Sequence, residues 1–434
     1  MTLDTPLHQL GLAEAARLIA SGKITSEALV SACLARIAER ETVVQAWSSI
    51  DPDYALAQAR GCDTGPSRGP LHGVPIGVKD VLDTYDMPTE MGSPIYKGLR
   101  PAWDASCVAL ARAAGAVILG KTVTCEFAGM APGATTNPHD ASRTPGGSSS
   151  GSGAAVADFM VPLAFGTQTG GSVLRPAAFC GVMGYKPTFG TFNRAGVKFA
   201  AESLDTIGLI ARDLEDLALM RAVLTNSEAV APAMPQAQLR IGVCQTYLWH
   251  KAEPGARAAL ERAASAAREA GAHVEDFVLP PPFSELTATR EILNNVERAR
   301  SLAYEWTHHR SAISPALTRS IELGLATTDQ QYRAALRVAE WCRLELDTLF
   351  GAFDVLLTPS ANGEAPEGIA YAGDPSFQGL WTLLHVPTIS LPAGRGPNRM
   401  PVGVQMIAPR YGDHKLLDAA HWLIARAGVH GLME

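Results

Sequence analysis

Three short segments of the chain hold residues that could perform acyl-transfer chemistry. They are residues 73–80 (GVPIGVKD), 146–151 (GGSSSG) and 166–172 (GTQTGGS). The third segment ends at Ser172, whose hydroxyl becomes a nucleophile only when a base removes its proton. Two glycines precede it, and backbone without Cβ atoms can turn tightly enough to direct several N–H groups at one oxyanion. The pattern therefore predicts a serine nucleophile at the end of its own oxyanion loop.

Lys79 is the residue that could serve as the base, because no histidine lies in these segments. It follows a Val- and Ile-rich stretch typical of a buried strand, and burial lowers the pKa of a lysine amine. The hydroxyl of Ser148 can both donate and accept a hydrogen bond, so it could relay a proton between Lys79 and Ser172. Taken singly, the segments also fit a solvated Lys-Asp pair, a flexible linker and a Gly-rich turn capped by serine.

Taken together and in this order, the segments resemble the signature of the amidase signature family. The matching stretches are GVPIGVKD, TPGGSSSGSGAAVA and GTQTGGSVLRPAAFCGVMGYKPTFG, and Ser148 lies 24 residues before Ser172, the separation that this family shows. The later stretches HVPTISLPAG and MPVGVQMIA are similar to the family's C-terminal strands. The resemblance is dense over residues 65–212 and 354–427 and weak between them.

This resemblance implies a role for each matching residue. Ser172 would be the nucleophile, Ser148 the bridging serine entered through a cis peptide from Gly147, and Lys79 the base, neutral in the resting enzyme. Thr167 would support Ser148 by a hydrogen bond. The oxyanion hole would consist of the backbone N–H groups of Thr169, Gly170, Gly171 and Ser172. No metal site and no cofactor are expected, and the reaction would be hydrolysis of a carboxylic amide through an acyl-enzyme.

Two positions depart from the common family pattern and bear on the substrate. Many members have Asp where this chain has Gln168, and many place an arginine two residues after the nucleophile, whereas Arg175 stands three after it. The stretch GTQTGGSVLRPA resembles the malonamidase-like branch, in which the matching arginine binds a substrate carboxylate. A guanidinium can bind a carboxylate in bidentate fashion, but Arg175 could equally form an internal ion pair.

Further pocket residues are expected near Cys125 and near residue 381. The other candidate substrate-binding residues are Phe127, Gly129 and Met130. Phe and Met at such positions more often belong to the core. Trp381 and His385 lie where relatives have pocket or core residues, and we expect His385 to be a core histidine with satisfied hydrogen bonds.

The alternation of helix-like and strand-like stretches predicts an α/β fold. The resemblance implies a single large domain, with a mixed central sheet covered by helices on both faces. We expect residues 1–60 to form an N-terminal helical region that packs on the core or on a partner subunit. Residues 61–434 would form the α/β core, with a mainly helical insertion near 255–350. The polar residues 131–153 are interpreted as a functional loop, followed by a helix over 154–160.

Composition excludes several classes of function. The net charge is -7 and no basic run occurs, which disfavours a nucleic-acid groove. The seven cysteines are scattered without a C-x-x-C, which indicates reduced thiols in the cytoplasm rather than disulfides or a zinc site. Neither a signal peptide nor an apolar membrane span is expected. The expected partner is a small amide or carbamate, and the sequence allows a homodimer.

Several alternatives bear on the reaction. Residues 147–151 match G-x-S-x-G, but the polar stretch NPHDASRTP stands where a nucleophile elbow needs an apolar strand. A phosphate-binding loop fails because no G-K-[ST] follows. The amidase subunit of a tRNA-dependent amidotransferase stays open, and so does the scissile bond, which could belong to an amide, a carbamate (urethane) or a urea derivative.

Overall fold

An eleven-stranded sheet runs through the molecule in the order β1-β3-β2-β4-β6-β5-β10-β11-β9-β7-β8. The structure is a computed structural model that describes residues 5–429, so the outermost residues of both predicted regions lie outside the described part. The strands are β1 (Trp47–Ile50), β2 (Pro75–Lys79), β3 (Val117–Thr122), β4 (Leu163–Gln168), β5 (Met183–Lys186), β6 (Thr206–Ala211), β7 (Arg240–Cys244), β8 (His273–Phe277), β9 (Val355–Pro359), β10 (Thr388–Arg395) and β11 (Pro401–Ile407). Because β2 is parallel to both β3 and β4 while β10 is antiparallel to its neighbours, the sheet is mixed, as predicted.

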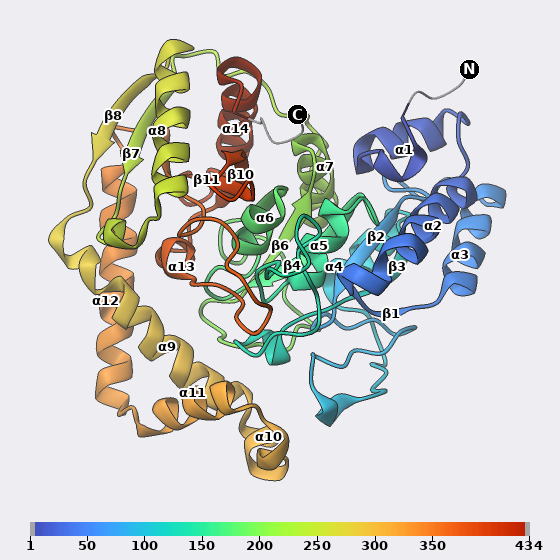
Figure 1. Cartoon of the computed structure of the whole chain (residues 1–434), viewed down its shortest axis with the longest axis horizontal. Coiled ribbons are helices and arrows are strands. Elements are labelled where there is room, and N and C mark those ends of the chain that lie inside the picture. The colour runs from blue at the N-terminus through green and yellow to red at the C-terminus, as the bar shows by residue number, and fades with distance from the viewer. Residues whose placement is uncertain (1–4, 430–434) are drawn as a thin grey trace.

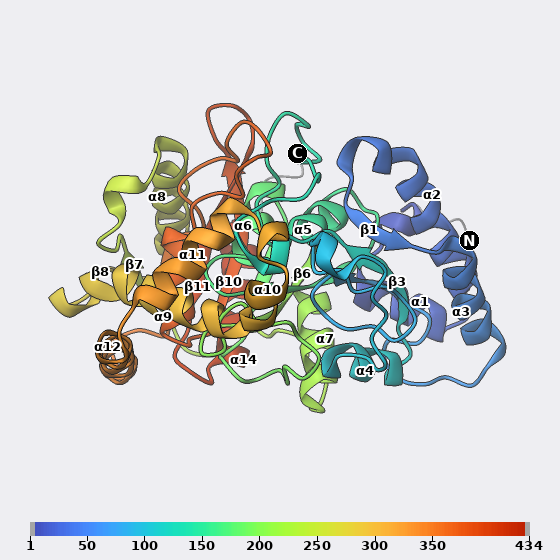
Figure 2. The same ribbon diagram turned by 90° about the horizontal axis from the view of Figure 1, so that it is seen from below.

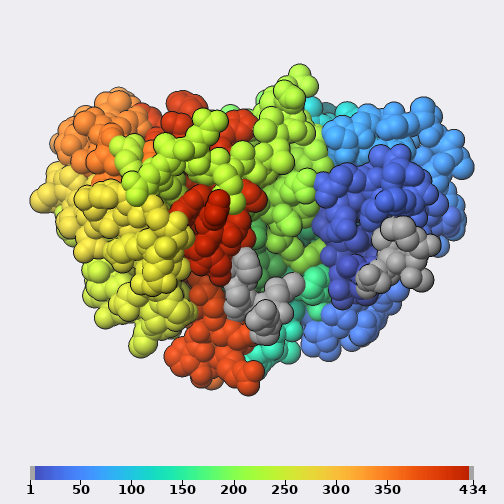
Figure 3. All heavy atoms as spheres, turned by 90° about the horizontal axis from the view of Figure 1, so that it is seen from above, coloured from blue at the N-terminus to red at the C-terminus, as the bar shows by residue number. Residues whose placement is uncertain are grey.

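Helices flank this sheet on both faces (Figure 1). They are α1 (Leu12–Ala20), α2 (Ser26–Val44), α3 (Pro52–Thr64), α4 (Ser106–Ala113), α5 (Ser150–Ala157), α6 (Leu174–Cys180), α7 (Leu214–Thr225), α8 (Pro254–Glu269), α9 (Leu286–Ser301), α10 (Ala303–His308), α11 (Pro315–Ala326), α12 (Asp329–Leu349), α13 (Ser376–Leu383) and α14 (Asp413–Ala427). The C-terminal helix α14, red in Figure 3, packs between α8 and α7. The α/β prediction with one domain is confirmed, and the division at residue 60 stays a prediction.

The helices α9–α12 form an arm that extends below the sheet in Figure 1. In the view from below, α9 and α11 run side by side, and α9 also contacts α12 and α13 (Figure 2). Glu305 ties the arm to the core, because its carboxylate accepts hydrogen bonds from Lys198 (2.5 Å) and Tyr96 (2.6 Å). The arm therefore brings α9 next to α13, which borders the site described below.

The Ser- and Gly-rich stretch differs from its prediction as a loop. Helix α5 begins at Ser150 rather than at residue 154, and it ends at Ala157. A Cβ at Gly151 would overlap the carbonyl oxygen of Ala46 and the N–H of Val123. Serine and glycine are poor helix formers, but here the close approach to neighbouring backbone requires small residues, and tertiary packing overrides their low propensity.

Another difference lies inside the region expected to be mainly helical. Residues 273–277 form β8, which pairs in parallel with β7 at the edge of the sheet. Its residues are largely exposed, so it lacks the apolar run that marks a buried strand. Between α1 and α2 the chain turns at Gly22, which has φ +67°, and Thr25 caps α2 by accepting a hydrogen bond from the N–H of Ala28. Among the described helices, none has the length and apolarity needed to cross a bilayer.

Candidate active site

The amine of Lys79 lies among three oxygen atoms at the end of β2. Its Nζ is 2.8 Å from the Oγ of Ser148, 2.8 Å from the Oγ1 of Thr167 and 3.3 Å from the carbonyl oxygen of Thr167. Lys79 ends β2, and Thr167 is the penultimate residue of the adjacent parallel strand β4. The carboxyl ends of these strands meet at one edge of the sheet, where α/β folds place their ligands. The structure thus brings three of the predicted residues together.

Burial sets the protonation state of Lys79. Its side chain is fully enclosed, and loss of hydration lowers the pKa of the amine to about 7. The carboxylate of Asp205 opposes this shift, and the guanidinium of Arg175 adds to it. Near pH 7 a large share of Lys79 is therefore neutral and can accept a proton.

The peptide bond between Gly147 and Ser148 is cis, as the family resemblance implies. Hydrogen bonds from three other segments hold this unit. The carbonyl oxygen of Ser148 accepts from the N–H of Cys125 (3.1 Å), and the N–H of Gly147 donates to the carbonyl oxygen of Ala372 (3.1 Å). The Nη2 of Arg175 donates to the carbonyl oxygen of Gly147 at 2.5 Å. The position of the Ser148 hydroxyl beside Lys79 therefore depends on residues far apart in the sequence.

Ser172 lies in the loop between β4 and α6 and is 7% exposed. Its carbonyl oxygen accepts a hydrogen bond from the N–H of Ser149 (3.2 Å), the residue after Ser148. Within the part of the chain that the structure describes, the N–H groups of Gly170, Gly171 and Ser172 have no protein acceptor. Free N–H groups on successive residues form the kind of concave nest that binds an anion.

Gln168 and Thr382 hold this loop against α13. The Oε1 of Gln168 accepts hydrogen bonds from the N–H groups of Val173 (2.9 Å) and Leu174 (3.0 Å) at the start of α6. Its Nε2 donates to the Oγ1 of Thr382 (3.0 Å), which in turn donates to the carbonyl oxygen of Gly170 (2.7 Å). The amide of Gln168 therefore satisfies the start of α6 without adding a negative charge.

Asp205 belongs to the site although the sequence did not mark it. The Oγ1 of Thr169 donates to its Oδ1, while its Oδ2 accepts from the N–H groups of Ala200 (2.6 Å) and Ala201 (3.2 Å). Burial raises the pKa of this carboxyl group, and these hydrogen bonds oppose the rise. A lone aspartate before β6 has no spacing that separates it from an ordinary turn residue, so only the folded chain identifies it as a support of the loop that carries Ser172.

Arg175 is buried beside the bridging serine, with 2% of its surface exposed. Apart from the bond to Gly147, its Nε and Nη1 atoms have no hydrogen-bond partner among the described residues. None of the ion pairs in that part of the chain includes Arg175, so the structure shows no internal ion pair of the kind that the sequence left open. Burial lowers the pKa of this guanidinium to about 10, and repulsion from Arg290 adds to the effect.

Two of the other predicted pocket residues, Phe127 and Gly129, pack against the apolar side chain of Leu317. Phe127 is fully buried in an apolar cluster that includes Leu317, and its ring meets that of Tyr96 edge-on at 6.0 Å. A Cβ at Gly129 would clash with the Cδ2 of Leu317 at 2.6 Å, while Met130 is partly exposed. Phe127 is therefore packed among apolar residues, and its contact with substrate stays a prediction.

His385 is the core histidine that the sequence predicts. Its Nε2 is 2.8 Å from the carbonyl oxygen of Ser203 and 3.0 Å from the Nη2 of Arg343, and its ring stacks on Phe189 with centroids 4.0 Å apart. Burial, reinforced by Arg343, lowers the pKa of the imidazole to about 3, so it stays neutral at physiological pH. Trp381 is likewise fully buried.

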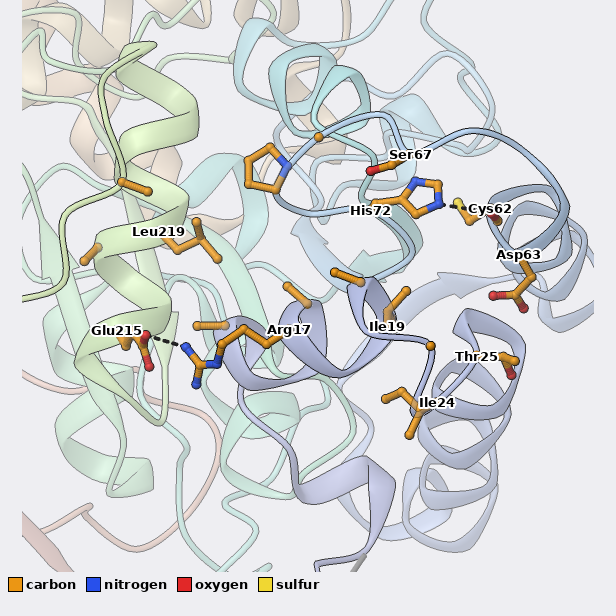
Figure 4. Close-up of a pocket in the computed structure, with 18 of the residues that line it drawn as sticks. Arg17, Ile19, Ile24, Thr25, Cys62, Asp63, Ser67, His72, Glu215 and Leu219 are labelled. Carbon is orange, nitrogen blue, oxygen red and sulfur yellow. Dashed lines mark hydrogen bonds and ion pairs between the residues drawn. The ribbon is translucent and has the colours of Figure 1, made fainter. Parts of the chain in front are cut away.

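A cavity of about 670 Å³ opens in another part of the molecule (Figure 4). Helices α1 and α7 and the segment after α3 line it, and it contains the ion pair of Arg17 and Glu215 (2.5 Å) and the hydrogen bond between His72 and Cys62 (3.0 Å). None of the predicted site residues reaches it. Within residues 5–429 no cluster of His, Cys, Asp and Glu could hold a metal ion.

Known proteins resemble the chain in both sequence and structure. The sequence profile of the Amidase family matches residues 28–417. A glutamyl-tRNA(Gln) amidotransferase subunit from Chloroflexus aggregans is 35% identical, with 95% of each chain covered. A solved amidase superposes with a TM-score of 0.88 at 31% identity, covering 96% of this chain and all of that one. The peptide amidase of Stenotrophomonas maltophilia superposes with a TM-score of 0.82 at 28% identity, with 98% of each chain covered.

The family profile spans most of the chain, and the superposed structures share its mixed sheet and helices throughout. The expectation that no nucleic acid is involved gains no support, because the name of the first relative refers to tRNA. The chain belongs to the amidase family, in its amidase signature fold, and is an enzyme that hydrolyses carbon–nitrogen bonds.

Proposed function

We propose that Ser172 is the nucleophile of this amidase and that Lys79 activates it through Ser148. Neutral Lys79 takes the proton of Ser148, Ser148 takes the proton of Ser172, and the Ser172 oxygen attacks the amide carbonyl. The observation that carries the proposal is the 2.8 Å separation of Lys79 Nζ and Ser148 Oγ, at an amine whose pKa burial lowers to about 7. A lysine with an ordinary pKa would be protonated and could not act as the base.

The negative charge that develops on the carbonyl oxygen during the attack needs hydrogen-bond donors to stabilise it. The free N–H groups of residues 170–172 would receive it together with that of Thr169, whose side chain Asp205 holds. The proton then returns through Ser148 to the leaving nitrogen, which breaks the C–N bond and leaves an acyl ester on Ser172. Water attacks this ester after giving its proton to the same relay, which releases the acid and restores Ser172.

We further propose a small substrate whose carboxylate meets Arg175, as in the malonamidase-like branch. The support is a buried guanidinium with two unpartnered nitrogens beside the bridging serine. Met130, Phe127 and Gly129 would line more distant walls. The seven cysteines are all buried and unpaired, which favours a reducing, cytoplasmic setting. A homodimer is the proposed assembly.

The second candidate function is that of the amidase component of a glutamyl-tRNA(Gln) amidotransferase. It is favoured by the match of 35% identity over 95% of both chains to a subunit of such an enzyme. In such an assembly the same serine would release ammonia for use elsewhere. Carbamate or urea-type substrates remain alternatives of the first function, because the same acyl chemistry serves all three bonds.

The test of the proposed function is the variant Ser172→Ala. Because the acyl-enzyme cannot form without this hydroxyl, amide hydrolysis should fall by at least about 10³-fold. A fluorophosphonate should label the wild-type protein at Ser172 and leave the variant unlabelled, as peptide mass spectrometry can show. Ser314→Ala is the matched control, since the Ser314 hydroxyl has no partner in the described structure and should be dispensable. Labelling of another serine would contradict the assignment.

A further inference from the structure

A second arginine, Arg290 of helix α9, reaches the oxyanion loop from the helical arm. A Cβ built on Gly170 would lie 3.3 Å from the Nη1 of Arg290, and one built on Gly379 of α13 would lie 2.7 Å from its Nε. The guanidinium therefore occupies the space between the oxyanion loop and α13. Larger residues at either glycine would displace it, so this contact depends on both.

Arg175 and Arg290 border the same short segment, residues 373–375. A Cβ on Gly373 would lie 2.7 Å from the Cδ and 3.2 Å from the Nε of Arg175. Pro375 lies 3.2 Å from the Cβ position of Gly170, and the Nη1 of Arg290 lies 3.3 Å from the same position. The two guanidiniums thus approach the bridging serine and the oxyanion loop from neighbouring directions, although 115 residues separate them in the sequence.

Neither arginine of this pair forms an ion pair within the described structure. Arg290 forms no hydrogen bond or ion pair there, and two nitrogens of Arg175 have no partner. Glu291 attracts Arg290 and Asp374 attracts both arginines, but Lys251 (3.1 Å) and the N–H of Ser376 (2.8 Å) already bind the Asp374 carboxylate. Two neighbouring like charges, of which Arg175 is buried with free donors and Arg290 is half-buried, are unfavourable, and an anion that binds both would relieve the cost.

We propose that Arg175 and Arg290 together bind one anionic group of the substrate, so that this enzyme selects amides bearing a carboxylate within a few bonds of the scissile carbonyl. The inference rests on the proposed function and adds a second guanidinium, supplied by the helical arm. Gln168 is consistent with it, because an aspartate there would place a negative charge beside the bound anion. Arg290 is then a determinant of specificity rather than of the chemical step.

The wild-type enzyme provides the first test. Succinamate and its methyl ester are of similar size and differ by one negative charge, and ammonia release gives kcat/KM for each. We expect succinamate to be favoured by about 10-fold or more, as for a hydrogen bond to a charged group. Equal values of kcat/KM for succinamate and its methyl ester would overturn the proposal that Arg175 and Arg290 bind an anionic group. Continued labelling of Ser172 by a fluorophosphonate would leave the proposed function standing in that case, whereas absence of labelling would overturn that function itself.

The variant Arg290→Gln provides the second test. It should lower the ratio of kcat/KM for succinamate to that for the methyl ester by about 10- to 100-fold, and Arg290→Lys should restore part of the ratio. Arg300→Gln is the matched control on the same helix, since Arg300 lies over the Tyr332 ring at 4.4 Å, and the ratio should stay at the wild-type value. An unchanged ratio in Arg290→Gln, or an equal fall in Arg300→Gln, would overturn the proposal.

A third measurement uses the wild-type protein alone and does not depend on the folding of any variant. Succinate should inhibit hydrolysis of the neutral methyl ester competitively, while dimethyl succinate at the same concentration should not. Equal inhibition by both compounds would show that no anion is recognised and would overturn the site.

Discussion

Two buried lysines on adjacent strands differ in what surrounds their amines. Lys121 of β3 forms an ion pair with Asp80 (3.1 Å) and donates to the Oγ1 of Thr89 (2.6 Å). Lys79 of β2 meets only hydroxyl and carbonyl oxygens, and among the described residues no carboxylate pairs with it. An ion pair stabilises the charged form of an amine, and burial without one favours the neutral form. Lys121 is therefore suited to a structural role, whereas Lys79 is suited to proton transfer.

This difference predicts the pH dependence of catalysis. The active form has neutral Lys79, and burial lowers its pKa to about 7. Below that pH the protonated share grows, so kcat/KM should fall about tenfold for each pH unit and should level off above it. The measurement is a pH profile from 5 to 9 with a neutral amide. Lys79→Ala should lose most activity and also this dependence.

Lys186 offers the matched control for that profile. It is also fully buried with a pKa lowered to about 7, but its Nζ donates to the carbonyl oxygens of Val386 (2.6 Å) and Pro187 (3.0 Å), away from Ser148. Lys186→Met should keep the midpoint of the wild-type profile. If the midpoint of the pH profile moved in Lys186→Met but stayed unchanged in Lys79→Ala, the ionising group would be Lys186 and the assignment to Lys79 would be wrong.

At the scale of elements, the oxyanion loop depends on a helix that follows it by two hundred residues. The loop between β4 and α6 has few apolar side chains of its own, and Thr382 of α13 connects Gly170 to Gln168. Helix α13 in turn packs on α9, which carries Arg290. The position of the proposed oxyanion donors and the position of the second arginine are therefore coupled through one helix.

This connection predicts the effect of Thr382→Val. The change removes both hydrogen bonds at nearly constant volume and leaves the buried Nε2 of Gln168 unpaired, which should cost about 1–3 kcal/mol of unfolding free energy. We also expect kcat to fall by about tenfold, because the loop loses its tie to α13. Urea denaturation and steady-state kinetics measure the two effects.

Thr388→Val is the control for this experiment. The Oγ1 of Thr388 is buried without a partner in the described structure, so its replacement should leave stability the same or raise it slightly. If Thr388→Val lost as much unfolding free energy as Thr382→Val, the loss in Thr382→Val could not be attributed to the hydrogen bonds of its hydroxyl.

At the scale of the whole molecule, one chain supplies every group that the proposed reaction uses. The parallel strands β2 and β4 carry the lysine and the oxyanion loop, α5 follows the bridging serine, and the arm α9–α12 supplies Arg290. The sheet continues from this point to β8 at its edge, and helices such as α8 and α12 lie beside it there (Figure 1). No second protein chain is needed to complete the arrangement of these residues.

The chain purified alone should therefore hydrolyse simple amides. We expect ammonia release from succinamate that is proportional to enzyme concentration and needs no added protein or tRNA. The comparison is the same assay on Ser172→Ala, which should give no release. Activity that appears only after addition of partner subunits would favour the amidotransferase alternative and would contradict the self-contained enzyme.

Much of the fold could be predicted from the sequence, and the elements that were predicted wrongly differ for physical reasons. The strands near residues 75 and 402 lie in stretches rich in apolar residues, which mark buried strands. By contrast β8 is an exposed edge strand without such a run, and α5 consists of residues that ordinarily form loops. In both elements the partner across space, rather than the local residues, favours the observed structure.

For the site, the sequence by itself determined which residues are available for the reaction, because Lys79, Ser148 and Ser172 stand in short motifs of defined order and spacing. It did not reveal Asp205 or Arg290, which have no motif around them. Only the tertiary structure decided the charges: burial lowers the pKa of Lys79 to about 7, and packing leaves Arg175 with unpartnered nitrogens near a second arginine, Arg290. The physical reason is that hydration and distances between charges depend on segments far apart in the chain.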